Sequence, residues 1–201
     1  MKIHLFTVLF AVAASATASP TERWLDPECF AVNRAPMRTS FIVFPTASEA
    51  VPENDYTRSP FYRTLNGEWA FLRAERPGAE PEGFFRTGYD DSSWGVMPVP
   101  GIWELNGYGD PVYTNKPYPW YKFFEVKPPL VPHEQNYTGL YRRTVRVPAD
   151  WKGRDAFIHI GSATSNVTLW VNGREVGYSE DSKLEAEFDV TRYITPGRDN
   201  L

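Results

Sequence analysis

The chain has 201 residues, of which 42% are hydrophobic and 15% aromatic, and this is enough for a packed core. Its 18 prolines and 14 glycines favour many short strands and turns over long helices. The formal net charge is -4 and the acids and bases are interspersed, so the composition points neither to nucleic acid nor to an anionic membrane surface as a partner.

Residues 1–18 are predicted to be a secretory signal peptide. Lys2 gives the positive start, a short apolar run follows, and Ala16-Thr17-Ala18 is a small-residue cleavage pattern. The apolar run is too short to cross a bilayer. We therefore expect an exported protein, periplasmic or extracellular, without a membrane partner; a buried N-terminal helix is the competing interpretation. Cys29 is the single cysteine, so the chain forms no internal disulfide.

Residues 19–60 are predicted to form an extended N-terminal arm. The segment shows no sustained periodicity and is interrupted by prolines, yet its content of aromatic and branched residues is high for a disordered linker. A segment of this kind cannot make its own core. We expect it to pack on its own domain or on a neighbouring subunit.

Residues 61–201 are predicted to form one all-β domain. Strand patterns occur at residues 68–74, 139–147, 155–160 and 187–190, and another strand is expected to start at residues 200–201. Between them lie a loop at 76–83, a capped turn at 89–94 and an irregular segment of about 35 residues between Met97 and Pro132. Short strands separated by turns indicate an antiparallel β-sandwich of the jelly-roll kind.

The clearest local signal is a β-hairpin around Asn172-Gly173. This dipeptide suits a type I′ turn, because both central residues of such a turn have positive φ. A two-residue loop predicts that Val171 lies opposite Arg174, Leu169 opposite Val176, and Val167 opposite Tyr178. The hairpin leads into a polar loop at residues 179–183, where a rigid support would hold a carboxylate for binding.

Common catalytic motifs are absent from the sequence. There is no nucleophile elbow, phosphate-binding loop or dinucleotide fingerprint, and the histidines lack spaced metal-ligand partners. His159 is interpreted as a surface or satisfied sheet residue. The segment after Met97 does carry the flat rings and amides that bind sugars; these are Trp103, Tyr108, Tyr113, Asn115, Tyr118 and Trp120. From its spacing alone, Asn115 fits a turn residue ahead of Pro117 better than a ligand, and Asp181 could likewise be a loop cap.

Several motifs in order resemble the family 2 glycoside hydrolases, and among them the β-galactosidase branch. They include "LNGEWAF", "YDDSSW", "DPVYTN" and "GYSEDSKLEAEFD", and the resemblance covers residues 25–201. It implies the N-terminal sugar-binding jelly-roll domain, which is galactose-binding-domain-like. It also implies that Asn115 and Asp181 contact galactose hydroxyls, that Asp181 ligates Na+, and that the arm supports a homo-oligomer in the full-length enzyme.

The resemblance further implies an activity that this segment does not complete. The full-length enzyme would hydrolyse terminal non-reducing β-D-galactose residues in β-galactosides with retention. Its catalytic glutamates and Mg2+ ligands would lie in a (β/α)8 barrel that the sequence lacks, so we expect no catalytic residue here, an apparently truncated chain and no activity alone. The alternatives are a free-standing, non-catalytic carbohydrate-binding module and a purely structural β-sandwich.

Overall fold

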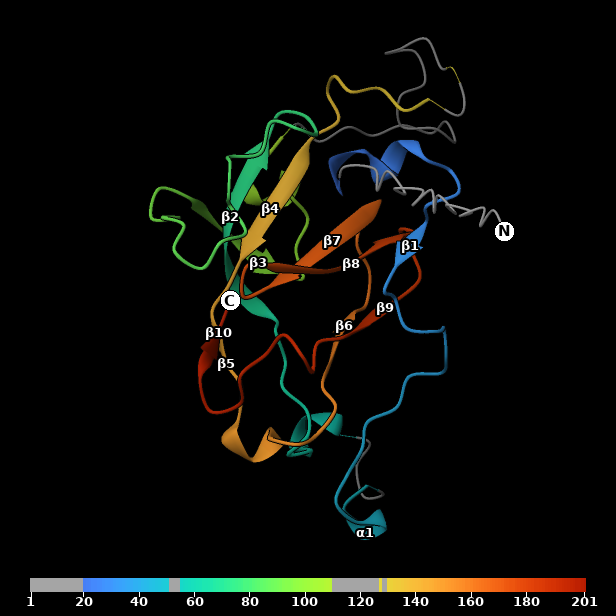
Figure 1. The fold of residues 1–201 in the computed structure, drawn as a ribbon, viewed down its shortest axis with the longest axis vertical. Coiled ribbons are helices and arrows are strands. Elements are labelled where there is room, and N and C mark those ends of the chain that lie inside the picture. The colour runs from blue at the N-terminus through green and yellow to red at the C-terminus, as the bar shows by residue number, and fades with distance from the viewer. Residues whose placement is uncertain (1–19, 51–54, 110–126, 128–129) are drawn as a thin grey trace, which may run out of the picture.

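The computed structural model describes residues 20–50, 55–109, 127 and 130–201 (Figure 1). The described helical elements are short: η1 (Pro20–Leu25), α1 (Ala47–Ala50), η2 (Tyr56–Arg58), η3 (Glu104–Asn106) and η4 (Ala149–Trp151). The described strands are β1 (Ala31–Val32), β2 (Gly67–Ala74), β3 (Gly95–Val99), β4 (Thr138–Arg142), β5 (Val145–Arg146), β6 (Phe157–Ile160), β7 (Asn166–Val171), β8 (Arg174–Glu180), β9 (Ala186–Asp189) and β10 (Asp199–Asn200).

All described strand pairs are antiparallel. Two three-stranded sheets have the orders β3-β2-β4 and β1-β8-β7, and the pairs β6-β9 and β10-β5 extend the structure. The predicted all-β, antiparallel sandwich is therefore confirmed. The strand expected at residues 200–201 is β10, which pairs with β5.

The irregular segment expected from Met97 begins later than predicted. Residues 97–99 belong to β3, where Met97 pairs with Trp69 on β2 and is fully buried. Two prolines concealed this strand: Pro98 lies within it and removes one backbone donor, and Pro100 follows it directly. Residues 100–109 have little regular structure apart from η3.

Two rings of this segment pack on the sheet. Trp103 and Tyr108 lie with ring centroids 5.6 and 4.6 Å from that of Phe71, which is fully buried at the centre of β2. A Cβ at Gly139 would collide with Trp103, and one at Gly95 would collide with the Tyr108 hydroxyl. The two glycines therefore make room for the rings.

The β7–β8 hairpin has the predicted turn. Asn172 and Gly173 have φ of +52° and +78°, as a type I′ turn requires. The Asn172 amide donates to Tyr193 O and Asn200 Oδ1, both at 2.8 Å, and its Oδ1 accepts from Leu201 N at 3.0 Å. This end is called the turn end, and the end formed by Asn166 and Glu180 is called the open end.

The predicted register is correct only next to the turn. Val171 pairs with Arg174 and Trp170 with Glu175, but Leu169 then pairs with Gly177 and Val167 with Ser179. A β-bulge at Val176 inserts one residue into β8 and shifts every later pair by one. The predicted pairs Leu169–Val176 and Val167–Tyr178 are therefore wrong.

The hairpin packs on β6 and β9. Val176 is 1% exposed and belongs to a cluster of buried side chains with Phe188, which is fully buried on β9. The cluster also contains Ala156, Val171, Ala186, Val190 and Tyr193. In β8, which lies between β1 and β7, residues 176–179 are buried in succession, and this is the pattern of a strand covered on both faces.

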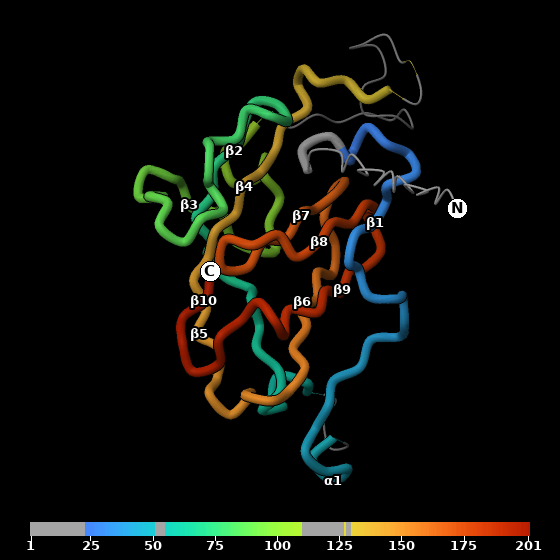
Figure 2. The backbone as a smooth tube through the Cα atoms, in the orientation of Figure 1, coloured from blue at the N-terminus to red at the C-terminus, as the bar shows by residue number. Residues whose placement is uncertain are grey.

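The N-terminal arm docks on the domain that follows it. β1 pairs with the end of β8, placing Ala31 opposite Ser179, and Arg34 forms an isolated bridge with Phe188. Figure 2 shows the arm running beside β8 and β9 and on to α1. The proposed signal peptide lies outside the described residues. The boundaries at residues 18 and 60 stay predictions.

Candidate functional site

Asp181 lies directly after β8, at the open end of the hairpin. Its side chain is exposed, and its φ is +117°, a conformation that L-residues rarely adopt. Its N–H donates to Ser165 O at 3.1 Å, and the N–H of Glu180 donates to Phe30 O at 2.9 Å. The loop before β7 and the arm therefore fix the backbone that carries the carboxylate.

The Asp181 carboxylate has one oxygen bound and one open. Oδ1 accepts from Lys183 N at 2.8 Å and from Leu184 N at 3.2 Å. These backbone hydrogen bonds, first that of Lys183, hold the pKa of Asp181 below its ordinary value, and the nearby Arg34 acts in the same direction. Asp181 is thus ionised at neutral pH, and Oδ2 accepts no hydrogen bond from the described residues. The loop-cap interpretation describes the contacts of Oδ1, and the role of Asp181 as a ligand stays a prediction.

A second contact holds the loops on either side of Asp181 together. Ser162 Oγ donates to Ser182 O at 2.7 Å. With the bond from Asp181 N to Ser165 O, it joins the loop before β7 to the loop after β8. Because both ends of the short loop are tied, its carboxylate is positioned before any ligand arrives.

The arm contributes a cation to the same place. Arg34 Nη1 donates to Ser179 Oγ at 2.9 Å and to Glu180 O at 3.3 Å. On the same strand the Tyr178 hydroxyl donates to Glu180 Oε1 at 2.6 Å. Burial first, and then Glu180, raise the pKa of Tyr178, so its hydroxyl remains a donor. Arg34 was not singled out from the sequence, because its partners follow it by about 145 residues.

The other predicted site residue, Asn115, lies outside the described residues, as do Tyr113, Tyr118 and Trp120. The structure therefore does not bring Asn115 and Asp181 together or separate them. Two of the predicted sugar-binding rings, those of Trp103 and Tyr108, are described, and both pack on Phe71. Trp103 Nε1 also donates to Tyr141 Oη at 2.5 Å. These two rings stabilise the β3-β2-β4 sheet.

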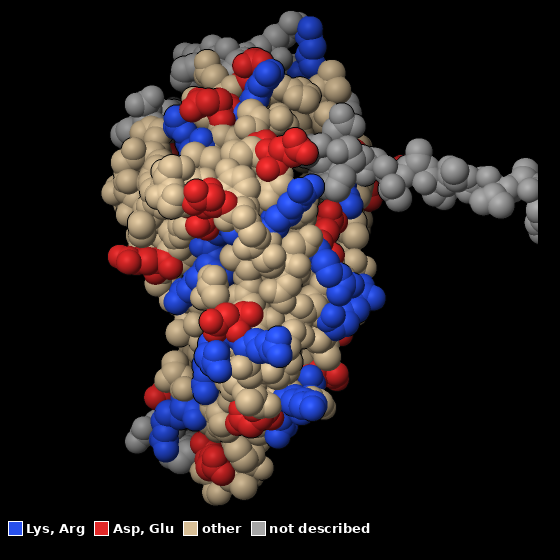
Figure 3. Space-filling view, turned by 60° about the vertical axis from the view of Figure 1, so that its left-hand side comes forward, with Lys and Arg blue, Asp and Glu red and all other residues tan. Residues whose placement is uncertain are grey.

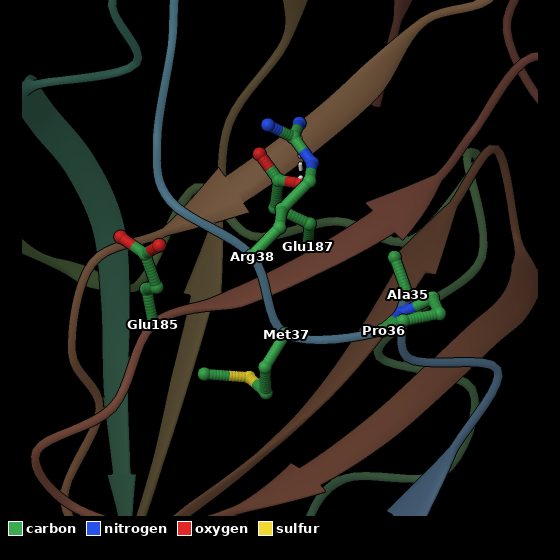
Figure 4. Close-up of a pocket in the computed structure, with 6 residues that line it drawn as sticks. All are labelled: Ala35, Pro36, Met37, Arg38, Glu185 and Glu187. Atoms are coloured by element: carbon green, nitrogen blue, oxygen red, sulfur yellow. Dashed lines mark ion pairs between the residues drawn. The ribbon is translucent and has the colours of Figure 1, made fainter.

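A charged pocket lies between the arm and β9 (Figure 4). Arg38 Nη2 pairs with Glu187 Oε2 at 2.7 Å, while Ser40 Oγ donates to Glu185 at 2.7 Å. His159 lies 3.4 Å from both carboxylates, as expected of a satisfied sheet residue. The pocket holds only about 10 Å³, room for one water. The Arg38–Glu187 ion pair attaches the arm to β9, and the pocket is too small for a sugar.

Neither surface charge nor metal ligation gives a further candidate site among the described residues. Figure 3 shows one face on which basic and acidic side chains are interspersed. Within the described ranges, no three His, Cys, Asp or Glu side chains gather in a way that would hold a metal ion. A search of the same residues finds no helix with the length and apolar character needed to cross a membrane.

Comparison with known proteins identifies relatives over most of the chain. Residues 62–201 match the family "Glycosyl hydrolases family 2, sugar binding domain". A β-galactosidase of Priestia megaterium is 36% identical over 188 residues, which are 93% of this chain and 18% of that protein. A β-galactosidase of Pectobacterium atrosepticum is 41% identical over 180 residues, 89% of this chain and 16% of that protein. The chain thus spans less than a fifth of these relatives.

Among solved structures, a β-glucuronidase of Bacteroides uniformis matches with a TM-score of 0.48 and 22% identity. The match covers 69% of this chain and 13% of that one.

Proposed function

The chain belongs to the family 2 glycosyl hydrolases, at their sugar-binding domain, and on that premise we propose that it is the N-terminal domain of an exported β-galactosidase. Its longer relatives are named β-galactosidases, which supports a glycosidase as the parent protein. A further domain supplies the catalytic carboxylates. This chain shapes the subsite for the terminal galactose.

The observation that carries the proposal is the carboxylate of Asp181. It is exposed, ionised, fixed through Oδ1 and open at Oδ2. An oxygen of this kind accepts a hydrogen bond from a sugar hydroxyl, and a charge-assisted bond is stronger than a neutral one. Asn115 provides a second contact to the galactose.

The same oxygen suits a sodium ion. Na+ is a hard cation that prefers oxygen ligands, and Asp181 Oδ2 is such a ligand without a hydrogen-bond donor in the described part of the chain. Asp181 supplies one ligand only, so the rest of the coordination shell comes from the sugar, water or another domain. The ion would neutralise the carboxylate and orient a sugar hydroxyl.

The chemistry follows from two carboxylates elsewhere in the protein. Retaining hydrolysis of a β-galactoside uses one carboxylate as nucleophile and one as acid and then base. Asp181 takes no part in those steps. It orients the galactose, and a contact that strengthens in the transition state raises kcat/KM. Mg2+ belongs to the catalytic domain and not to this chain.

The test is Asp181→Asn in the full-length protein. Asn keeps an Oδ1 acceptor for the N–H groups of Lys183 and Leu184, but it removes the charge that binds Na+. We expect kcat/KM for a β-galactoside to fall about 10- to 100-fold. Stimulation by Na+ over K+ should disappear.

Asp189→Asn is the matched control. Asp189 is also exposed, is the last residue of β9, and accepts from Thr191 N at 2.9 Å. This variant should keep both activity and the sodium response. Unchanged sodium stimulation in Asp181→Asn would overturn the assignment of Asp181. A full-length protein that hydrolyses no β-galactoside would overturn the proposed activity.

A further inference from the structure

A larger cleft lies at the turn end of the hairpin, away from Asp181. It is a depression open to solvent, with a volume of about 680 Å³. The side chains of Glu82, Arg86, Tyr89 and Asp90 line it, and Gly173 of the turn contributes backbone. The size admits a mono- or disaccharide.

A buried cation holds the loop that forms this cleft. Arg142 on β4 is 7% exposed; its Nε donates to Asp91 Oδ2 at 2.7 Å, and its Nη1 donates to Phe84 O and Arg86 O. The guanidinium also lies 5.4 Å from the ring centroid of Tyr89. The Arg142 side chain therefore contacts the loop at four residues, which are Phe84, Arg86, Tyr89 and Asp91.

The same loop is fixed to the hairpin. The ring of Phe85 stacks on that of Trp170 with centroids 5.9 Å apart, and Phe84 meets Trp170 edge-on at 5.3 Å. A Cβ at Gly173 would lie 3.8 Å from both Arg86 Cα and Phe85 O. The turn thus approaches the loop closely, and the cleft wall is rigid before any ligand binds.

The rigid loop presents polar groups that nothing else uses. Within the described residues, the side chains of Glu82, Arg86 and Thr87 form no hydrogen bond or ion pair. Asp90 Oδ1 accepts from Ser92 N at 3.0 Å. Hydrogen bonds from the side chain and then the N–H of Ser92 hold the pKa of Asp90 low, so this carboxylate is charged.

The charges decide the kind of ligand. One guanidinium and two carboxylates face the cleft, from Arg86, Glu82 and Asp90. Together they disfavour an anion, but they provide donors and acceptors for hydroxyl groups. The Tyr89 ring adds a surface for the C–H face of a sugar. A neutral, polyhydroxylated ligand matches this set.

We propose that the cleft formed by residues 82–90 and Gly173 is a second carbohydrate site, specific for a neutral saccharide and independent of Asp181. It depends on neither the proposed activity nor the sodium ion.

The test is a nuclear magnetic resonance titration of the 15N-labelled chain with lactose, cellobiose and sodium glucuronate. We expect lactose or cellobiose to shift the amides of Arg86, Thr87 and Gly173 with a millimolar dissociation constant, and glucuronate to bind more weakly. Arg86→Ala and Glu82→Gln should each weaken binding at least tenfold. Both changes affect surface groups, so the fold should persist.

Arg76→Ala is the control, because Arg76 is exposed on the neighbouring loop and outside the cleft. It should bind the sugars normally, and so should Asp181→Asn. The proposal is overturned if 100 mM of each sugar leaves these amides unshifted, or if the shifts surround Asp181 alone. It is also overturned if Arg86→Ala binds the sugars like the unmodified chain, or if glucuronate binds best. Loss of the Asp181 assignment leaves these outcomes unaffected, so the two proposals fail separately.

Discussion

The two ends of the β7–β8 hairpin are both rigid, but different contacts hold them. At the open end, backbone hydrogen bonds are the main contacts: Glu180 N donates to Phe30 O, and Asp181 N donates to Ser165 O. At the turn end, a single buried side chain, Arg142, binds the carbonyls of a loop 50 to 60 residues away in sequence. The open end thus relies on backbone pairing, whereas the loop at the turn end relies on one buried cation together with the packing of Phe84 and Phe85 on Trp170.

This difference predicts different responses to mutation. Backbone pairing at the open end is spread over several bonds, so only a change in strand spacing should disturb it. The turn end depends on three donor bonds from one guanidinium, so one substitution should loosen it. Three predictions follow from the comparison, in order of decreasing effect on stability.

Arg142→Met should have the largest effect. It leaves Phe84 O and Arg86 O without a buried partner and removes the ion pair with Asp91. Breaking a buried ionic network costs about 3 kcal/mol, to be measured by urea unfolding. Amide signals should change around Arg86 and stay constant around Asp181.

The control is Arg146→Met, which removes an exposed arginine 3.4 Å from Asp199. Exposed pairs contribute about 0–1 kcal/mol. If Arg142→Met cost no more than this control, or disturbed both ends equally, the proposed division between the ends would be incorrect.

Gly177→Ala should have an intermediate effect and should act on the open end. A Cβ there would collide with Val32 O and lie 2.8 Å from Phe188 Cδ1, so β1 would have to move away from β8. Overpacking of this kind costs about 1–3 kcal/mol. Limited proteolysis of the arm should become faster, while the amides of the 82–90 loop stay unchanged.

Gly161→Ala is the matched control at the same end, because a Cβ there meets nothing within 4 Å. Its arm should resist protease as in the unmodified chain. An equally resistant arm in Gly177→Ala would show that β1 does not depend on this close approach.

The smallest effect concerns a feature that the two ends share. Hydrogen bonds lower the pKa of both Asp181 and Asp90: those from Lys183 N and Leu184 N act on Asp181, and those from the Ser92 side chain and then Ser92 N act on Asp90. A lowered folded-state pKa gives stability that is present above the ordinary pKa and lost as pH falls through the folded pKa. Asp181→Asn and Asp90→Asn should therefore each lower the urea midpoint slightly at pH 7, match the unmodified chain in strong acid, and make the midpoint less sensitive to pH below about 4. An unaltered acid profile in either variant would disprove the contribution of that carboxylate.

Local signals account for the parts of the fold that were predicted correctly. Asn172-Gly173 specifies a turn through the conformations that these residues tolerate, and alternating apolar residues specify the strands beside it. The exposed loop carrying Asp181 follows from the end of that alternation. The role assigned to Asp181 came from the family resemblance and remains a proposal.

Tertiary contacts account for what was missed. The bulge at Val176 cannot be seen in its neighbours, because it suits the packing of β8 against β1 and Phe188. Arg142 lies in a strand pattern where an arginine normally faces solvent, and its acceptors at Phe84 and Arg86 precede it by more than 50 residues. The second cleft depends on those contacts, and for that reason it has no sequence signature.

The attachment of the Asn172 side chain bears on how the molecule ages. Asparagine followed by glycine is the pair most prone to deamidation in flexible peptides, since the next backbone nitrogen can attack the side-chain amide. Here that amide donates to Tyr193 O and Asn200 Oδ1 and accepts from Leu201 N, so it is not free to rotate toward the attacking nitrogen. Deamidation at this position would then proceed mainly from unfolded molecules, and its rate in storage would report how often the protein unfolds.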